Sequence, residues 1–122
     1  MAKKILAVED SPTILAIIKT LLQDAGYEVI AATDGQDALN RARKEKADLI
    51  VMDLMLPKLD GYKVCAMLKF DEKYKKTPII ILTARADEKD KKMGQEVAAD
   101  AYITKPFQPE NLLSKIKELI KE

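Results

Sequence analysis

Runs of consecutive apolar residues, separated by longer stretches with helical periodicity, restrict the fold of this chain more than any other feature. The three strongest runs are Ile5–Val8, Leu49–Met52 and Ile79–Leu82, and none of them alternates between apolar and polar side chains. Continuous runs of this length are typical of strands that are buried on both faces of a parallel sheet. Two weaker runs, Val29–Ala32 and Ala101–Ile103, complete a set of five predicted strands.

Amphipathic helical patterns lie between these strands. One helical stripe consists of Ile14, Ile17, Ile18, Leu21 and Leu22, and a second consists of Leu112, Leu113, Ile116, Leu119 and Ile120. Ser11 followed by Pro12 is a typical helix start, with a capping hydroxyl and a proline in the first turn. The order of a strand followed by a helix, repeated five times, predicts an α/β doubly wound domain. Its five-stranded parallel sheet would carry helices on both faces, because right-handed crossovers place them there.

Length and composition predict one domain, residues 1–122, and exclude several classes of partner. The 21 basic and 20 acidic side chains leave a formal net charge of +1, so we expect neither nucleic acid nor an anionic membrane as a partner. No apolar run approaches the roughly 20 residues of a membrane helix. The single cysteine, Cys65, is interpreted as a core residue and fits a reducing cytoplasm. The chain contains no histidine, which excludes histidine metal ligands and an internal phosphohistidine.

Polar and charged side chains follow four of the predicted strands at their carboxyl ends: Glu9 and Asp10, Asp53, Thr83, and Lys105. Open parallel sheets bind their ligands at this edge. If the first and third strands are neighbours, three carboxylates converge there. Taken singly, each residue has an ordinary explanation as a cap or a turn residue. Their shared position at one edge favours a functional site.

Three converging carboxylates repel one another, so their joint ionisation costs free energy. A hard divalent cation offsets this cost, and Mg²⁺ needs only one or two carboxylates together with water. Zinc is disfavoured because no histidine or cysteine ligand is on offer. Lys105 adds a fixed positive charge and Thr83 adds a hydroxyl. Such groups around Asp53 form a site for a phosphoryl group, with Asp53 as the candidate nucleophile.

Four stretches of the sequence resemble the receiver domain of bacterial response regulators, the family of the chemotaxis regulator. They read KILAVEDSPT, IVMDLMLPKLDGY, IIILTARAD and DAYITKPF, and the resemblance extends over essentially the whole chain. It implies a flavodoxin-like fold of the receiver type, with strand order 2-1-3-4-5. It also implies a two-component signalling domain that catalyses only its own phosphorylation and dephosphorylation.

The resemblance implies a role for each residue of the site. Asp53 is expected to accept the phosphoryl group, and Lys105 is expected to contact the phosphoryl oxygens. Glu9 and Asp10 are expected to bind Mg²⁺ together with Asp53, with Asp10 as a direct ligand and Glu9 acting through water. The backbone carbonyl of Met55 matches a further metal ligand.

The resemblance also implies how the signal leaves the site. Phosphorylation is expected to draw Thr83 inward, after which Tyr102 moves and the face of the fourth helix, fifth strand and fifth helix changes shape. The family often has a cis peptide bond before the proline that corresponds to Pro106. The donor is a sensor histidine kinase, a phosphotransfer protein or a small acyl phosphate. The recipient is a downstream protein or a linked output domain, and the chain is a monomer or a phosphorylation-dependent dimer.

Three other classes are compatible with an acid after a parallel strand. A dehalogenase-like phosphatase also uses an aspartate nucleophile and Mg²⁺, but it needs a second aspartate where this chain has Met55. A receiver-shaped binding module without the chemistry is disfavoured because the acidic and lysine positions are all filled. A flavodoxin-like cofactor binder needs a phosphate loop after the first strand, where this chain has Glu9 and Asp10 instead.

Overall fold

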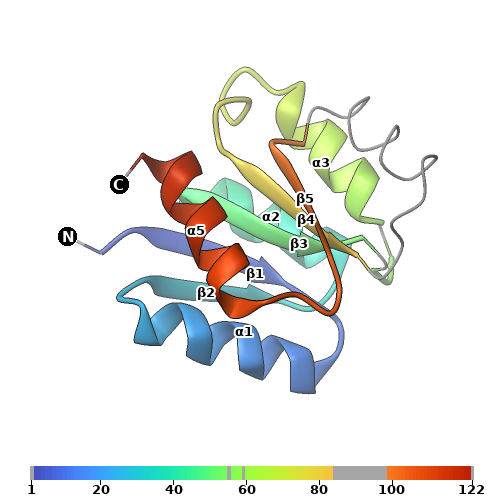
Figure 1. The fold of residues 1–122 in the computed structure, drawn as a ribbon. Helices are drawn as coiled ribbons and strands as arrows, with labels where there is room; N and C mark the ends of the chain where they lie inside the picture. The colour runs from blue at the N-terminus through green and yellow to red at the C-terminus, as the bar shows by residue number, and fades with distance from the viewer. Residues whose placement is uncertain (1, 55, 59, 84–98, 122) are drawn as a thin grey trace.

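Five parallel strands form the centre of the computed structural model, which describes residues 2–54, 56–58, 60–83 and 99–121 (Figure 1). The strands are β1 (Lys4–Val8), β2 (Glu28–Ala32), β3 (Leu49–Asp53), β4 (Ile79–Thr83) and β5 (Ala101–Thr104). They lie side by side in the order β2-β1-β3-β4-β5. This arrangement confirms the predicted doubly wound sheet. Its consequence for function is that β1 and β3 are neighbours.

In the described part of the chain, four helices cover the two faces of the sheet. They are α1 (Pro12–Asp24), α2 (Gly35–Glu45), α3 (Gly61–Lys69) and α5 (Pro109–Ile120). Helices α1 and α5 pack on one face, whereas α2 and α3 pack on the other. The expected fourth helix falls in residues 84–98, outside the described residues. No helix in the described part of the chain is long and apolar enough to cross a membrane.

Side-chain caps set the start of three helices. The Ser11 hydroxyl accepts a hydrogen bond from the backbone N–H of Ile14, and Pro12 is the first residue of α1, as predicted. Asp34 and Asp60 accept corresponding bonds at the starts of α2 and α3. Each cap pairs a backbone N–H that has no partner within its own helix.

Every residue of β3 and β4 is buried, which is what their continuous apolar runs predict. Along β3, Ile50 and Met52 face α2 and α3, whereas Leu49 and Val51 face α1 and α5. Cys65 lies in the core on α3 and is fully buried, as expected. The helices on the two faces therefore pack closely against the central strands. This packing holds the residues at the carboxyl ends of these strands in fixed positions.

Candidate functional site

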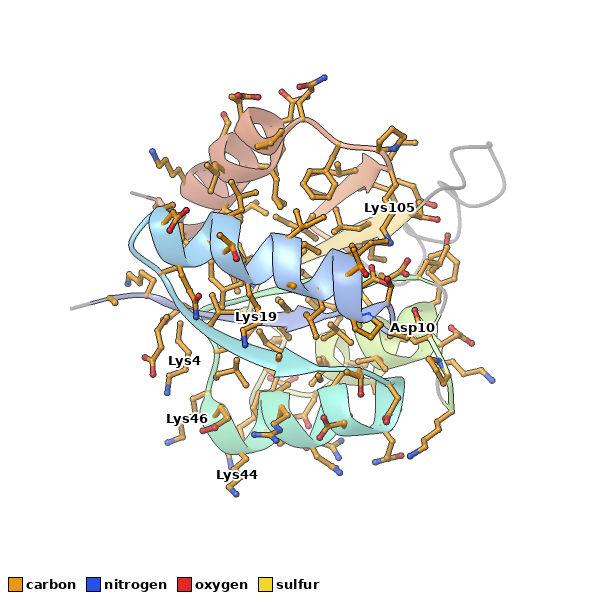
Figure 2. All side chains as sticks on the ribbon, turned by 90° about the horizontal axis from the view of Figure 1, so that it is seen from below. Lys4, Asp10, Lys19, Lys44, Lys46 and Lys105 are labelled. Atoms are coloured by element: carbon orange, nitrogen blue, oxygen red, sulfur yellow. The ribbon has the colours of Figure 1, made fainter. Side chains whose placement is uncertain are left out.

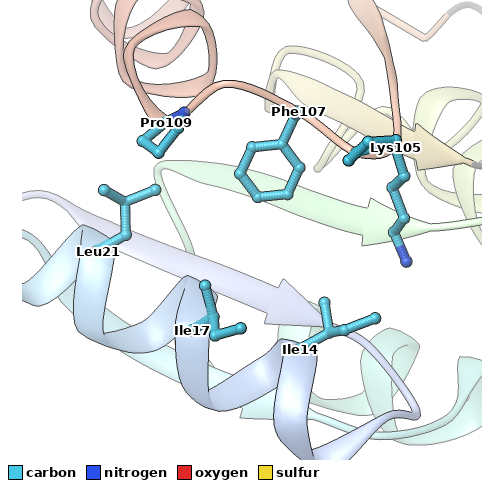
Figure 3. Close-up of a pocket in the computed structure, with 7 residues that line it drawn as sticks. Ile14, Ile17, Leu21, Lys105, Phe107 and Pro109 are labelled. Atoms are coloured by element: carbon cyan, nitrogen blue, oxygen red, sulfur yellow. The ribbon is translucent and has the colours of Figure 1, made fainter.

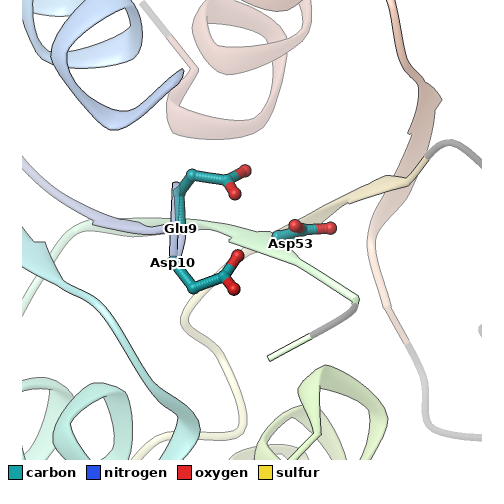
Figure 4. A group of neighbouring side chains, drawn as sticks. All are labelled: Glu9, Asp10 and Asp53. Atoms are coloured by element: carbon teal, nitrogen blue, oxygen red, sulfur yellow. The ribbon is translucent and has the colours of Figure 1, made fainter. Parts of the chain in front are cut away.

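Three carboxylates meet where β1 and β3 end. Glu9 and Asp10 directly follow β1, and Asp53 is the last residue of β3. The two strands pair in parallel with Val8 opposite Met52, so the residues that follow lie side by side. One carboxylate oxygen from each acid lies within 4.8 Å of the other two. Figure 4 shows the three side chains directed into the same space.

The three acids differ in their exposure to solvent. Glu9 and Asp53 are buried, with 2% and 6% of their surface exposed, whereas Asp10 is exposed. Burial raises the pKa of Glu9, and the charge of Asp53 adds to this effect. Hydrogen bonds to Glu9 from Lys105 and from the backbone N–H of Ser11, the latter at 3.2 Å, offset only part of the rise. The pocket is thus closed around Glu9 and open to solvent at Asp10.

Lys105 brings a positive charge to these acids from the β5 edge of the sheet. It follows β5, and its ammonium group donates to Glu9 at 2.6 Å and to Asp53 at 3.1 Å. Burial alone would lower the pKa of Lys105, but its bonds and attraction to both carboxylates outweigh burial and raise it. The lysine therefore stays charged at neutral pH. Its peptide bond to Pro106 is cis, as the resemblance implies.

Among the described residues, one ammonium group faces three carboxylates, which leaves this pocket with an excess of negative charge. Figure 2 shows Asp10 and Lys105 at one end of the molecule, whereas Lys4, Lys44 and Lys46 lie at the other end. The donor set consists of carboxylate oxygens, which are the ligands that a hard cation such as Mg²⁺ prefers. The residues present therefore fit a magnesium ion. Met55, whose carbonyl was expected as a further ligand, lies outside the described residues.

The expected switch residues share one face of the sheet. Thr83 ends β4 and is fully buried. Tyr102 lies on β5 opposite Ile81, and side chains two residues apart on a strand point to the same face. Thr83 and Tyr102 are therefore diagonal neighbours on the face covered by α2 and α3. Tyr102 packs there against a cluster that includes Tyr62.

The segment after Asp53 is held close to the site. Leu54 is buried, and its backbone N–H donates to Leu82 of β4 at 3.0 Å. The N–H of Gly61 then donates to the carbonyl of Leu54 at 3.1 Å. A Cβ atom at Gly61 would lie 2.6 Å from the carbonyl oxygen of Asp53, so only glycine fits there. Helix α3 therefore begins directly against the proposed nucleophile.

Sequence reasoning missed three parts of this arrangement. It did not anticipate the close packing of Gly61 against Asp53, and it gave Tyr62 no role. It also did not anticipate that Lys105 would bond Glu9 as well as Asp53. A glycine directly after a capping acid was a weak signal for close packing, whereas nothing in the local pattern distinguishes Tyr62 from an ordinary core residue of a helix.

An apolar groove of about 460 Å³ lies beside the acidic pocket, between α1 and the segment that joins β5 to α5 (Figure 3). Ile14, Ile17 and Leu21 line it from α1, and Phe107 lines it from the opposite side. Lys105 stands at its border, with its ammonium group turned toward the acids. The apolar lining offers no ligand for a cation or a phosphoryl group, so the chemistry belongs to the acidic pocket.

Comparisons with known proteins agree with this geometry. The family model described as the response regulator receiver domain matches residues 5–117. The alkaline phosphatase synthesis transcriptional regulatory protein PhoP of Bacillus subtilis is 46% identical over 121 residues, which cover 99% of this chain and 50% of that protein. The chain thus spans about half the length of this curated relative.

Two solved structures show the same fold over nearly all of both chains. The chemotaxis response regulator CheY4 of Vibrio cholerae has a TM-score of 0.91 at 38% identity, covering 98% of this chain and 99% of that one. The receiver domain of a sensor histidine kinase from Pseudomonas aeruginosa PAO1 has a TM-score of 0.92 at 33% identity, covering all of both chains. This chain therefore belongs to the receiver domain family of two-component response regulators.

Proposed function

We propose that residues 1–122 form a phosphoryl-accepting receiver domain in which Asp53 is the acceptor. The observation that carries the proposal is the position of the Asp53 carboxylate. It lies 3.1 Å from the ammonium group of Lys105 and beside two further acids at the ligand-binding edge of the sheet. A carboxylate held against a fixed cation is suited to accept a group whose negative charge that cation can balance.

Glu9, Asp10 and Asp53 would hold Mg²⁺ in this proposal, with Glu9 acting through water and the carbonyl of Met55 as a further ligand. The Pseudomonas receiver has a magnesium ion coordinated in its active-site cleft, which supports this assignment. When bound, the ion would supply charge neutralisation and a template for phosphoryl oxygens. The exposure of Asp10 leaves the ion a route from solvent.

The chemistry transfers a phosphoryl group from an external donor, because the chain has no histidine of its own. A carboxylate oxygen of Asp53 forms a bond to phosphorus, and the bond between phosphorus and the donor's nitrogen or oxygen breaks in line with it. The donor leaves with the electron pair of that bond. Lys105 balances the charge on the transferred group, which requires it to give up part of its contact with Glu9. The chain thus acts only on itself and turns over no separate substrate.

The signal would leave the site through Thr83 and Tyr102 and change the face formed by the fourth helix, β5 and α5. The donor is a sensor histidine kinase, a phosphotransfer protein or a small acyl phosphate. The recipient is a partner protein or a linked output domain, and the longer transcriptional regulator PhoP supports the second possibility. We further propose that the protein is cytoplasmic and is a monomer or a phosphorylation-dependent dimer. In this proposal the residues of this chain contact no nucleic acid.

A receiver fold that binds partners without phosphorylation is the competing function. Intact mass spectrometry after incubation with acetyl phosphate and Mg²⁺ separates the two. We expect one added phosphoryl group on the wild-type protein, none on Asp53→Asn and none when EDTA removes the metal. The Asp53→Asn variant should keep the circular dichroism spectrum of the wild type. A normally phosphorylated Asp53→Asn protein, or a folded wild type that takes up nothing from acetyl phosphate or from a histidine kinase, contradicts the proposal.

A further inference from the structure

Two tyrosine hydroxyls meet on the face of the sheet that α3 covers. The hydroxyl oxygen of Tyr62, on α3, lies 3.3 Å from the hydroxyl oxygen of Tyr102, on β5, and either can be the donor. The two rings belong to one otherwise largely aliphatic cluster. A phenol in such surroundings is destabilising unless its hydroxyl finds a partner, and these two can serve each other. The pair therefore restrains both rings.

Tyr62 is the firmly held member of the pair. It is buried, with 8% of its surface exposed, and it follows the glycine that packs against the carbonyl of Asp53. Asp60 caps the same helix turn by accepting from the N–H of Lys63 at 3.0 Å. Gly61 thus packs the start of α3 against β3, the Asp60 cap fixes the first turn of the helix, and the Tyr62 ring has a defined position relative to the proposed acceptor.

Tyr102 is the more exposed member. It is half-buried and lies on β5, which pairs with β4 and forms an edge of the described sheet. Residues on an edge strand have fewer neighbours than those of a central strand. A movement of the Tyr102 ring away from α3 would separate the two hydroxyls and lose their hydrogen bond.

We propose that Tyr62 is a positioning residue for the switch, and that its hydroxyl holds Tyr102 in the conformation of the unphosphorylated protein. The inference rests on the proposed function, in which Tyr102 moves after Asp53 is phosphorylated. Because the bond exists in only one of the two conformations, it biases the equilibrium against the phosphorylated-like one. Its loss in Tyr62→Phe should raise the population of the moved Tyr102 ring by roughly 2- to 10-fold, the range for one net hydrogen bond.

The first test uses the free protein and needs no phosphorylation. Nuclear magnetic resonance with ¹³C-labelled tyrosine rings measures the side-chain rotamers of Tyr102 and its ring contacts with residue 62. We expect Tyr62→Phe to lower the population of the present rotamer, although the phenyl ring keeps the packing of α3. Tyr74→Phe is the matched control, since the Tyr74 hydroxyl donates to the carbonyl of Arg43, away from the switch.

The second test adds beryllofluoride, a mimic of the phosphoryl group, together with Mg²⁺. Tyr62→Phe should bind the mimic about 2- to 10-fold more tightly than the wild type, because less free energy is needed to release Tyr102. Tyr102→Phe removes the same bond from the other side. If both substitutions act through this bond, the double variant should gain no more than either single variant.

An unchanged Tyr102 rotamer in Tyr62→Phe overturns the inference, as does an equal shift in Tyr74→Phe. Unchanged or weaker binding of the mimic by Tyr62→Phe overturns it as well. Failure of the wild type to take up either the mimic or a phosphoryl group would count against the proposed function. In that case the rotamer measurement on the free protein still decides whether Tyr62 holds Tyr102.

Discussion

Two largely buried lysines at opposite ends of the sheet have very different surroundings. Lys69, with 6% of its side chain exposed, forms an ion pair with Asp100 and also donates to the carbonyl of Thr77 at 2.7 Å. Lys105, with 15% exposed, contacts two carboxylates and faces a third acid nearby. Counting the described residues, the charge of Lys69 is matched by one opposite charge and neutral acceptors, whereas the acids around Lys105 outnumber it.

The difference separates a structural contact from a functional one. Asp100 also accepts from the N–H of Ile79 at 2.8 Å, so the Lys69 pair ties the end of α3 to the starts of β4 and β5. A matched pair of this kind needs no further ligand. Within the described part of the chain, the pocket of Lys105 keeps an uncompensated negative charge, which costs stability in the free protein and is reduced when a cation binds. Such an imbalance at the ligand-binding edge is typical of a site that performs chemistry.

Removing the anion of the matched pair should have the largest effect on stability. Asp100→Asn keeps an oxygen for the N–H of Ile79 but leaves the Lys69 ammonium group without a counter-charge. Because Asp100 is one-third exposed, we expect a loss of about 2–3 kcal/mol, below the range for a fully buried pair. Urea denaturation measures this loss, which Mg²⁺ should not restore.

The matched control for this substitution is Glu72→Gln, which breaks the exposed ion pair between Lys75 and Glu72. An exposed pair contributes little, so the change should be below about 0.5 kcal/mol. Equal losses in Asp100→Asn and Glu72→Gln would show that burial of Lys69 does not matter and would remove the contrast between the two lysines.

Removing an acid from the pocket around Lys105 should change the stability less, and in the stabilising direction. Asp10→Asn relieves repulsion with Glu9 and Asp53, so we expect the thermal midpoint of the metal-free protein to rise by about 2 °C. Mg²⁺ should raise the midpoint of the wild type but not that of Asp10→Asn. The control Asp24→Asn, at the end of α1, should keep the response to Mg²⁺. A metal response that survives in Asp10→Asn would exclude this acid as a ligand.

The smallest effect concerns Cys65 on α3, whose thiol senses the charges of the ion pair between Lys69 and Asp100. Burial raises the pKa of this thiol to about 12 from a usual value of 9.0, with a small lowering contribution from Lys69 and a small raising one from Asp100. A thiol whose pKa is raised by folding contributes stability below about pH 9, and this contribution is lost as the pH rises from there toward about 12. Between pH 8 and pH 10, the wild type should therefore lose slightly more stability than Cys65→Ala.

Alkylation by iodoacetamide at pH 8 extends the measurement to the ion pair. Cys65 in the folded wild type should react at least about 100-fold more slowly than in urea, because the reagent needs a local opening. In Asp100→Asn the reaction should be faster, since the adjacent anchor of α3 is weakened. Rapid reaction of the folded wild type would contradict the burial of this end of α3.

The sheet was predictable because its signals are local. The runs that predict β3 and β4 are continuous because both faces of these strands are covered, and each run lies within one segment of the chain. The weaker runs belong to β2 and β5, the two edge strands, whose residues are mostly half-buried. A cap such as Ser11 is also local, because the hydroxyl bonds a backbone N–H three residues away.

The chemistry of the site was predictable to the extent that it depends on residue type and position along a strand. Acids and a lysine at the carboxyl ends of different strands must meet at one edge once the strands are parallel. The sequence by itself therefore determined the fold class, the edge that binds the ligand, and the residues brought there.

Only the tertiary structure decided which of these groups touch. Lys105 and Glu9 are 96 positions apart, and Tyr62 and Tyr102 are 40 apart. Neither pair leaves a trace in local periodicity, because each contact depends on how a helix or loop packs against a neighbouring strand. The close fit of Gly61 against Asp53 has the same origin. Residue identity specifies what a side chain can bond, whereas the packing of distant segments selects the partner that it does bond.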